Sequence, residues 1–171
     1  MDSQELKNRI FSKRPRYANI YKDLIASLAN KGNRKTEYIQ FGPIYQIYIY
    51  AFYIGIHRNE KISMPSRESS SEFYKISEWK PDSLVHFILM TMFSKIENLN
   101  LTTWNELENM DEAEIDSFVR ILIKTIEEYA NAGFSYLQSQ FEEDRNPFNQ
   151  PYIFADILRD LIEEKTANEV L

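Results

Sequence analysis

The sequence contains no cysteine, and this absence excludes several kinds of chemistry. Disulfides, thiolate nucleophiles and cysteine-rich zinc sites all require this residue. A chain without cysteine also suits a reducing compartment. Residues 1–10 are polar and mixed in charge, without the apolar core of an export signal. We therefore expect a cytoplasmic protein.

Long apolar runs and chain breakers are also scarce. The longest apolar stretch, residues 44–56, has 13 residues and is interrupted by Gln46 and Gly55, whereas a membrane-spanning helix needs about 20. No membrane partner is expected. The chain has only 4 glycines and 6 prolines, which favours long helices because these residues end regular structure.

Signatures of bound groups are missing as well. No glycine-rich loop ends in Gly-Lys-Ser or Gly-Lys-Thr, and the acidic residues do not have the spacing of a calcium loop. Neither a cofactor nor a metal site is expected, and we assign no catalytic residue.

Apolar and aromatic residues are abundant. Hydrophobic residues make up 43% of the 171 residues, and 11 Tyr and 11 Phe raise the aromatic fraction to 14%. This composition is far from that of a disordered chain, and the length is sufficient to bury one core. We expect a single domain over residues 1–171.

The apolar periodicity predicts an all-α fold of five or six helices with a minor β element around Ile39 or Ile62. The helices are expected at residues 2–11, 17–28, 43–56, 83–97, 111–141 and 151–162, with a turn or short helix at 102–110. The most apolar of them, residues 83–97, is the expected central core helix. Residues 63–80 are expected to form a long exposed connection, and residues 163–171 a frayed tail.

Charge is unevenly distributed along the chain. Residues 1–80 contain 14 Lys/Arg and 8 Asp/Glu, whereas residues 81–171 contain 6 and 18. A net charge of +6 followed by −12 suggests contacts with a polyanion and with a basic partner.

Several cations near the N-terminus are candidates for contact with a nucleic-acid backbone, since Phe11 and Tyr17 between them could stack on bases. They are Lys7, Arg9, Lys13, Arg14 and Arg16, extended by Lys31, Arg34 and Lys35. Arg14 and Arg16 are favoured because a guanidinium can grip phosphate with two hydrogen bonds. The alternative is a solvated helix end.

Other polar groups have structural explanations. The acidic stretch from Glu106 to Asp116 suits the start of a long helix, with a basic partner or a divalent metal as the alternative. His86 is expected in or near the core and His57 at a helix end. The aromatic rows are expected to be core, with a ligand pocket left open; they are Tyr38, Phe41 and Tyr45, and Tyr45, Tyr48 and Phe52.

Two short pieces match restriction-type nucleases superficially. They are Pro81-Asp82 and Glu163-Glu164-Lys165. Nuclease chemistry of that kind places its carboxylates and lysine on adjacent strands around a metal, but both pieces fall at expected helix ends.

Three stretches together resemble the small dnd system-associated proteins found beside bacterial genes for DNA phosphorothioation and restriction. They are Arg14-Pro15-Arg16-Tyr17, the stretch from Ala51 to Ile62 and the stretch from Glu127 to Phe134. The resemblance covers about residues 14–141. It implies an accessory role in a DNA-modification or anti-phage defence system within a protein assembly, and it brings no catalytic residues.

The favoured interpretation is a non-enzymatic accessory protein with protein partners, leaving nucleic-acid contact and homo-oligomers open. A metal-dependent nuclease or another small stand-alone enzyme is one alternative. A self-associating scaffold protein is the other.

Overall fold

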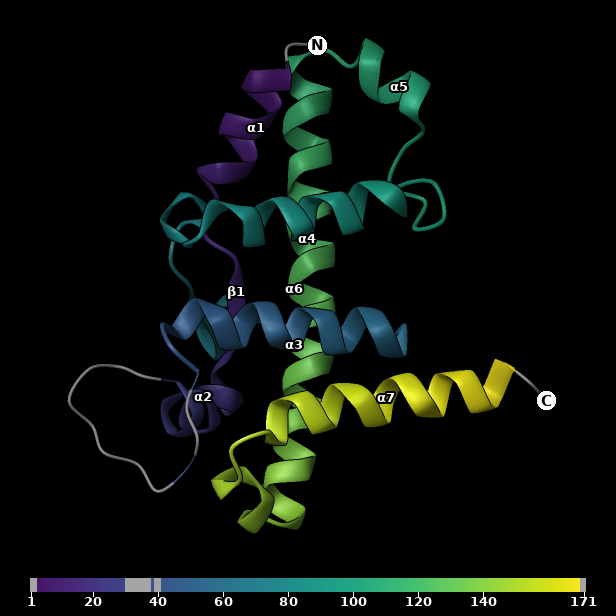
Figure 1. Cartoon of the computed structure of the whole chain (residues 1–171). Coiled ribbons are helices and arrows are strands. Elements are labelled where there is room, and N and C mark those ends of the chain that lie inside the picture. Colours follow the sequence, from purple (N-terminus) through teal and green to yellow (C-terminus); the bar gives the residue numbers. More distant parts are fainter. Residues whose placement is uncertain (1–2, 30–37, 39–40, 170–171) are drawn as a thin grey trace. The chain divides into compact units, whose positions relative to one another are not determined.

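The computed structural model describes residues 3–29, 38 and 41–169. It confirms the all-α fold with a minor β element (Figure 1). The described residues form seven α-helices, against the expected five or six: α1 (Ser3–Phe11), α2 (Lys22–Leu28), α3 (Ile44–Arg58), α4 (Asp82–Ser94), α5 (Trp104–Asn109), α6 (Glu112–Glu143) and α7 (Ile153–Glu169). Within this part of the chain, no helix is both long and apolar enough to cross a membrane.

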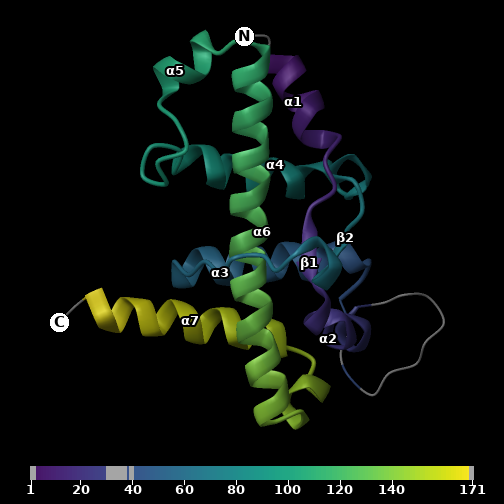
Figure 2. The ribbon, with the colours of Figure 1, turned by 180° about the vertical axis from the view of Figure 1, so that it is seen from behind.

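Short strands and 3₁₀ turns lie between several of the helices along the chain. They are the strands β1 (Arg16–Ala18) and β2 (Ser70–Glu72) and the 3₁₀ turns η1 (Asn19–Tyr21), η2 (Arg67–Ser69), η3 (Ile76–Glu78) and η4 (Asn146–Asn149). The two strands pair with each other (Figure 2). The two strands do not include Ile62, and Ile39 is outside the described residues.

The chain folds into two compact units. Unit 1 comprises residues 1–16 and 72–127, and unit 2 comprises residues 17–71 and 128–171. Each unit contains 10 Lys/Arg and 13 Asp/Glu, a net charge of −3. The basic and acidic halves of the sequence are therefore not the two units, because each unit combines residues from both halves.

In unit 1, residues 13–15 pair with residues 73–76, which the sequence predicted to lie in an exposed connection. The amide of Phe73 donates to the carbonyl of Pro15 at 2.7 Å, and that of Ile76 donates to Lys13 at 3.0 Å, so the two segments run antiparallel. Phe73, Ile76 and Trp79 are buried. The prediction of an exposed connection is wrong for these three side chains, because their burial in the core outweighs the polar residues around them.

Unit 2 is built around a very close approach of α3 to α6 (Figure 1). A Cβ atom added at Gly55 would lie 2.0 Å from the carbonyl oxygen of Tyr129, and one added at Gly133 would lie 1.8 Å from that of Ala51. Both distances are far inside van der Waals contact. Glycine at both positions therefore allows the two helix backbones to touch.

Some helix boundaries coincide with capping residues, and others differ from the predicted ones. Asn59 ends α3 in the left-handed conformation with a φ of 53°, which asparagine tolerates better than most residues. Thr103 and Glu106 form a reciprocal capping box at α5. The helix expected from Tyr17 begins only at Lys22, because residues 16–18 pair as a strand first. At the other end, α7 continues past the expected fraying point to Glu169.

Three buried tyrosines of unit 2 predict a loss of stability at high pH. Burial raises the pKa of Tyr21, Tyr50 and Tyr129 above the ordinary value. Because the folded state holds these protons more tightly than the unfolded state, their contribution is complete below about pH 10 and declines above it. Urea unfolding at a series of pH values, followed by circular dichroism, should show the free energy of unfolding falling above about pH 10.

Tyr50→Phe provides the control for this pH dependence. The Tyr50 hydroxyl donates to the carbonyl of Phe154 at 2.6 Å, so its loss should lower the free energy of unfolding by about 1–2 kcal/mol at neutral pH. The variant should also lose stability less steeply at high pH, since one titrating group is gone. An identical slope in both proteins would contradict the assignment of Tyr50.

Candidate functional site

The N-terminal cations predicted to contact a nucleic acid are distributed over α1, the segment after it and β1. Five of the eight are described: Lys7 and Arg9 on α1, Lys13 and Arg14 before β1, and Arg16 as its first residue. The other three, Lys31, Arg34 and Lys35, lie outside the described residues.

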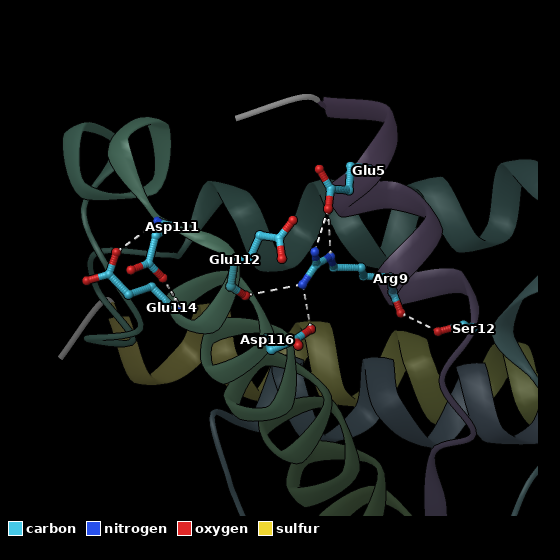
Figure 3. A network of polar contacts seen from close by, with 7 residues as sticks. All are labelled: Glu5, Arg9, Ser12, Asp111, Glu112, Glu114 and Asp116. Carbon is cyan, nitrogen blue, oxygen red and sulfur yellow. Dashed lines mark hydrogen bonds and ion pairs between the residues drawn. The ribbon is translucent and has the colours of Figure 1, made fainter.

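Arg9 connects α1 to the start of α6 within unit 1 (Figure 3). Its Nη1 donates to Asp116 Oδ1 at 2.8 Å and to the carbonyl oxygen of Glu112 at 3.2 Å, while its Nε donates to Glu5 Oε1 at 3.1 Å. The hydrogen bonds to Glu5 and Asp116 raise the pKa of Arg9. Arg9 thus uses its donors on protein groups and is better placed to fasten α1 than to bind phosphate.

Arg16 is likewise engaged by the protein. Its backbone amide donates to Glu127 Oε1 at 2.8 Å, and its Nη2 donates to Oε2 of the same carboxylate at 3.2 Å. Only 6% of the Glu127 side chain is exposed. The geometry therefore favours a structural role for Arg16, although the sequence favoured it as a phosphate ligand.

Lys7, Lys13 and Arg14 make no ion pair within the part of the chain that the structure describes. Lys7 and Arg14 are exposed, and Lys13 is half-buried. The Lys7 ammonium lies 5.2 Å from the centre of the Phe11 ring. Among the five described cations, these three are the ones still available to an external anion.

A further basic residue of unit 1, Lys80, forms an ion pair with Asp82. Lys80 Nζ lies 2.7 Å from Asp82 Oδ1, and Lys80 most strongly, then His86 and Lys7, hold the pKa of Asp82 below its ordinary value. Lys80 was not among the predicted cations because it is far from Lys7 along the chain.

The apolar helix α4 does not lie in the middle of the core. Its buried side chains are Val85, Ile88 and Met92, whereas Phe87 is 56% exposed and Met90 is 65% exposed. One turn beyond Met90, Phe93 stacks on the exposed Trp104 with ring centres 6.0 Å apart. The prediction of a central core helix is wrong here: the long stripe of buried side chains belongs to α6, and α4 is apolar on its outer face as well.

The acidic stretch carries the structural role that its position predicted. Asp111 and Glu114 each accept a hydrogen bond at 2.9 Å from the backbone amide of the other at the start of α6, and Figure 3 shows this pair. Hydrogen bonds from Thr103 and Thr102 lower the pKa of Glu106. Among residues 3–29, 38 and 41–169, no group of three His, Asp or Glu is arranged to hold a metal ion.

The histidines and the aromatic rows occupy different environments. His57 Nε2 hydrogen-bonds the carbonyl of Leu161 at 3.1 Å, whereas His86 is exposed rather than in the core, with its ring 6.2 Å from that of Phe11.

In the aromatic rows, Tyr48 and Phe52 are fully buried, as expected. Tyr38 lines a pocket of about 320 Å³ in unit 2.

The geometry gives unit 1 two exposed features that could bind other molecules: the exposed cations Lys7 and Arg14, and the outer face of α4. Neither resembles a catalytic constellation of nucleophile, base and oxyanion donor. Comparison of the chain with family models, with curated proteins and with solved structures gave no significant match in any of the three.

Proposed function

We propose that this protein is a non-enzymatic accessory component of a bacterial DNA-modification or anti-phage defence system, acting through protein–protein contacts and contacting the DNA backbone with its N-terminal cations. The resemblance of three stretches to dnd system-associated proteins supports the setting. The exposed features of unit 1 support the mode of action.

The exposed outer face of α4 is the observation that carries this proposal. Phe87 and Met90 are three residues apart, so both side chains lie on one side of the helix. Large aromatic and methionine side chains are enriched in the buried centres of protein interfaces, and clustered apolar exposure marks sites of interaction. A protein partner that covers this α4 face would remove both side chains from water.

A pull-down of the tagged protein from its host, with and without nuclease treatment, tests the protein contacts. We expect DNA-modification or restriction proteins to be recovered in both conditions. The double variant Phe87→Glu/Met90→Glu should lose them, because each new carboxylate would have to be buried without a partner charge. The matched control is Ile20→Glu/Tyr152→Glu, which alters two side chains of unit 2 that are 75% and 74% exposed.

Other outcomes would contradict the proposed function or favour one of its alternatives. Recovery of the protein alone would contradict the accessory role. Metal-dependent DNA cleavage by the purified protein would favour the nuclease alternative, and oligomers that dissociate with added salt would favour the scaffold alternative.

The DNA contact makes a separate prediction for salt dependence. Lys7→Glu/Arg14→Glu should weaken binding to duplex DNA and reduce the slope of log affinity against log salt by about 2, since each lost phosphate contact removes about 1. Fluorescence anisotropy measures both quantities. Lys22→Glu/Lys95→Glu changes the net charge equally at two other exposed lysines, so equal slopes in the two variants would rule out a contact localised at Lys7 and Arg14.

A further inference from the structure

A groove between α5 and α6 lies on a part of unit 1 that the proposed function does not use. It encloses about 420 Å³. Its lining is mixed: Leu101, Met110, Phe118 and Ile121 are apolar, Thr102, Asn109 and Ser117 are polar, and Glu106 and Glu114 carry carboxylates. Phe118 is buried at its base, while Ile121 remains exposed. The groove thus combines an apolar surface with two negative charges.

Both carboxylates are held in place by helix capping. Glu106 Oε2 accepts from the Thr103 amide at 2.9 Å and from the Thr102 hydroxyl at 3.1 Å. Glu114 Oε2 accepts from the Asp111 amide at 2.9 Å. A cation that approaches either group therefore meets an ordered carboxylate, which reduces the conformational entropy lost on binding.

The surrounding charge has one sign. Residues 96–119 contain seven Asp/Glu and no Lys/Arg, and Arg9 from α1 engages only Asp116 and a backbone carbonyl at this end of α6 (Figure 3). A nucleic-acid backbone would be repelled here, and the apolar lining favours a ligand with an apolar group of its own.

We propose that the α5–α6 groove binds a basic amphipathic segment of a partner protein, with one large apolar side chain on the groove lining and Lys or Arg residues beside Glu106 and Glu114. The charge complementarity selects the cations, and a groove of about 420 Å³ has room for a large apolar side chain. Recognition of an amphipathic helix by an apolar groove is a recurrent binding mode in proteins.

Selection from a random peptide library displayed on phage, with the purified full-length protein as bait, tests this site. We expect the selected peptides to share an apolar residue flanked by Lys or Arg. Calorimetry with the synthetic peptides should show affinity falling about tenfold or more in Glu106→Gln/Glu114→Gln. Glutamine can still accept the capping hydrogen bond, so circular dichroism should show an unchanged fold.

Two controls localise the effect. Glu97→Gln/Glu112→Gln removes the same charge from residues outside the groove lining, and should leave the affinity within about threefold. Phe87→Glu/Met90→Glu should leave peptide binding unchanged. The experiment therefore tests the proposed groove site independently of the proposed partner contact at the α4 face. The proposal would be overturned if no peptide were selected or if the selected peptides lacked cations. It would also be overturned if Glu106→Gln/Glu114→Gln bound the peptides as tightly as the unchanged protein, or if this variant abolished self-association.

Discussion

Replacing Gly133 with alanine is expected to lower the free energy of unfolding by at least about 3 kcal/mol, although alanine is the better helix former by about 1 kcal/mol. The new Cβ would lie 1.8 Å from the carbonyl oxygen of Ala51 and 2.5 Å from its carbonyl carbon. Both are backbone atoms of α3, so no side-chain rotation can relieve the collision. The helices must move apart and lose packing along their shared surface.

Urea unfolding followed by circular dichroism measures this loss, and Gly42→Ala is its control. At Gly42 an added Cβ would meet the end of the Gln46 side chain at 2.8 Å, a group that can rotate away, so we expect a change within about 1 kcal/mol. Equal stability of the Gly133 variant and the unchanged protein would show that α3 and α6 do not approach closely.

Tryptophan fluorescence adds a second signal to the same experiment. Trp79 and Trp104 are the two tryptophans of the chain, and both belong to unit 1, whereas Gly133 belongs to unit 2. Loss of circular dichroism before loss of the Trp79 signal would show that unit 2 unfolds on its own. Coincident transitions would show one cooperative unfolding step.

Arg16→Ala should lower the free energy of unfolding by about 3 kcal/mol, because it leaves the buried carboxylate of Glu127 without the guanidinium. The Arg16 side chain is 27% exposed, whereas that of Glu127 is only 6% exposed. Most of the lost stability therefore comes from keeping the Glu127 carboxylate buried without its partner charge. The double variant Arg16→Ala/Glu127→Gln should regain part of the loss, since a neutral amide is easier to bury and still accepts from the Arg16 amide.

Arg14→Ala is the matched control for Arg16. The Arg14 side chain is exposed, and its loss should change stability by no more than about 0.5 kcal/mol while weakening DNA binding. If both variants are equally stable and both weaken DNA binding, Arg16 acts as a phosphate ligand after all. Thermal unfolding and DNA anisotropy on the same preparations separate the two roles.

Several residues in the stretches 14–17, 51–62 and 127–134 have structural roles. Gly55 and Gly133 bring α3 against α6, and Arg16 pairs with Glu127. Asn131 donates to the carbonyl oxygens of Ile62 and Ser63 at 3.2 and 3.3 Å. These residues support packing and backbone connections, and none of these contacts forms a catalytic arrangement.

Local pattern alone was enough to find most of the helices. The apolar period of α6 and Pro43 at the start of the expected helix 43–56 act over a few neighbouring residues, so they can be recognised in the chain itself. In the sequence Gly55 is visible only as an interruption of an apolar run; its contact with Tyr129 is not, because a glycine does not identify which backbone approaches it.

Long-range pairing decided the rest. The sequence favoured Arg14 and Arg16 alike as phosphate ligands, yet Arg16 pairs with a carboxylate 111 residues away whereas the Arg14 side chain is exposed. Phe87 and Met90 looked like core because hydrophobicity reports what burial would gain and not which helix face finds a neighbour. Each unit combines two distant stretches, so the distribution of charge and the exposed apolar face were settled only by tertiary contacts.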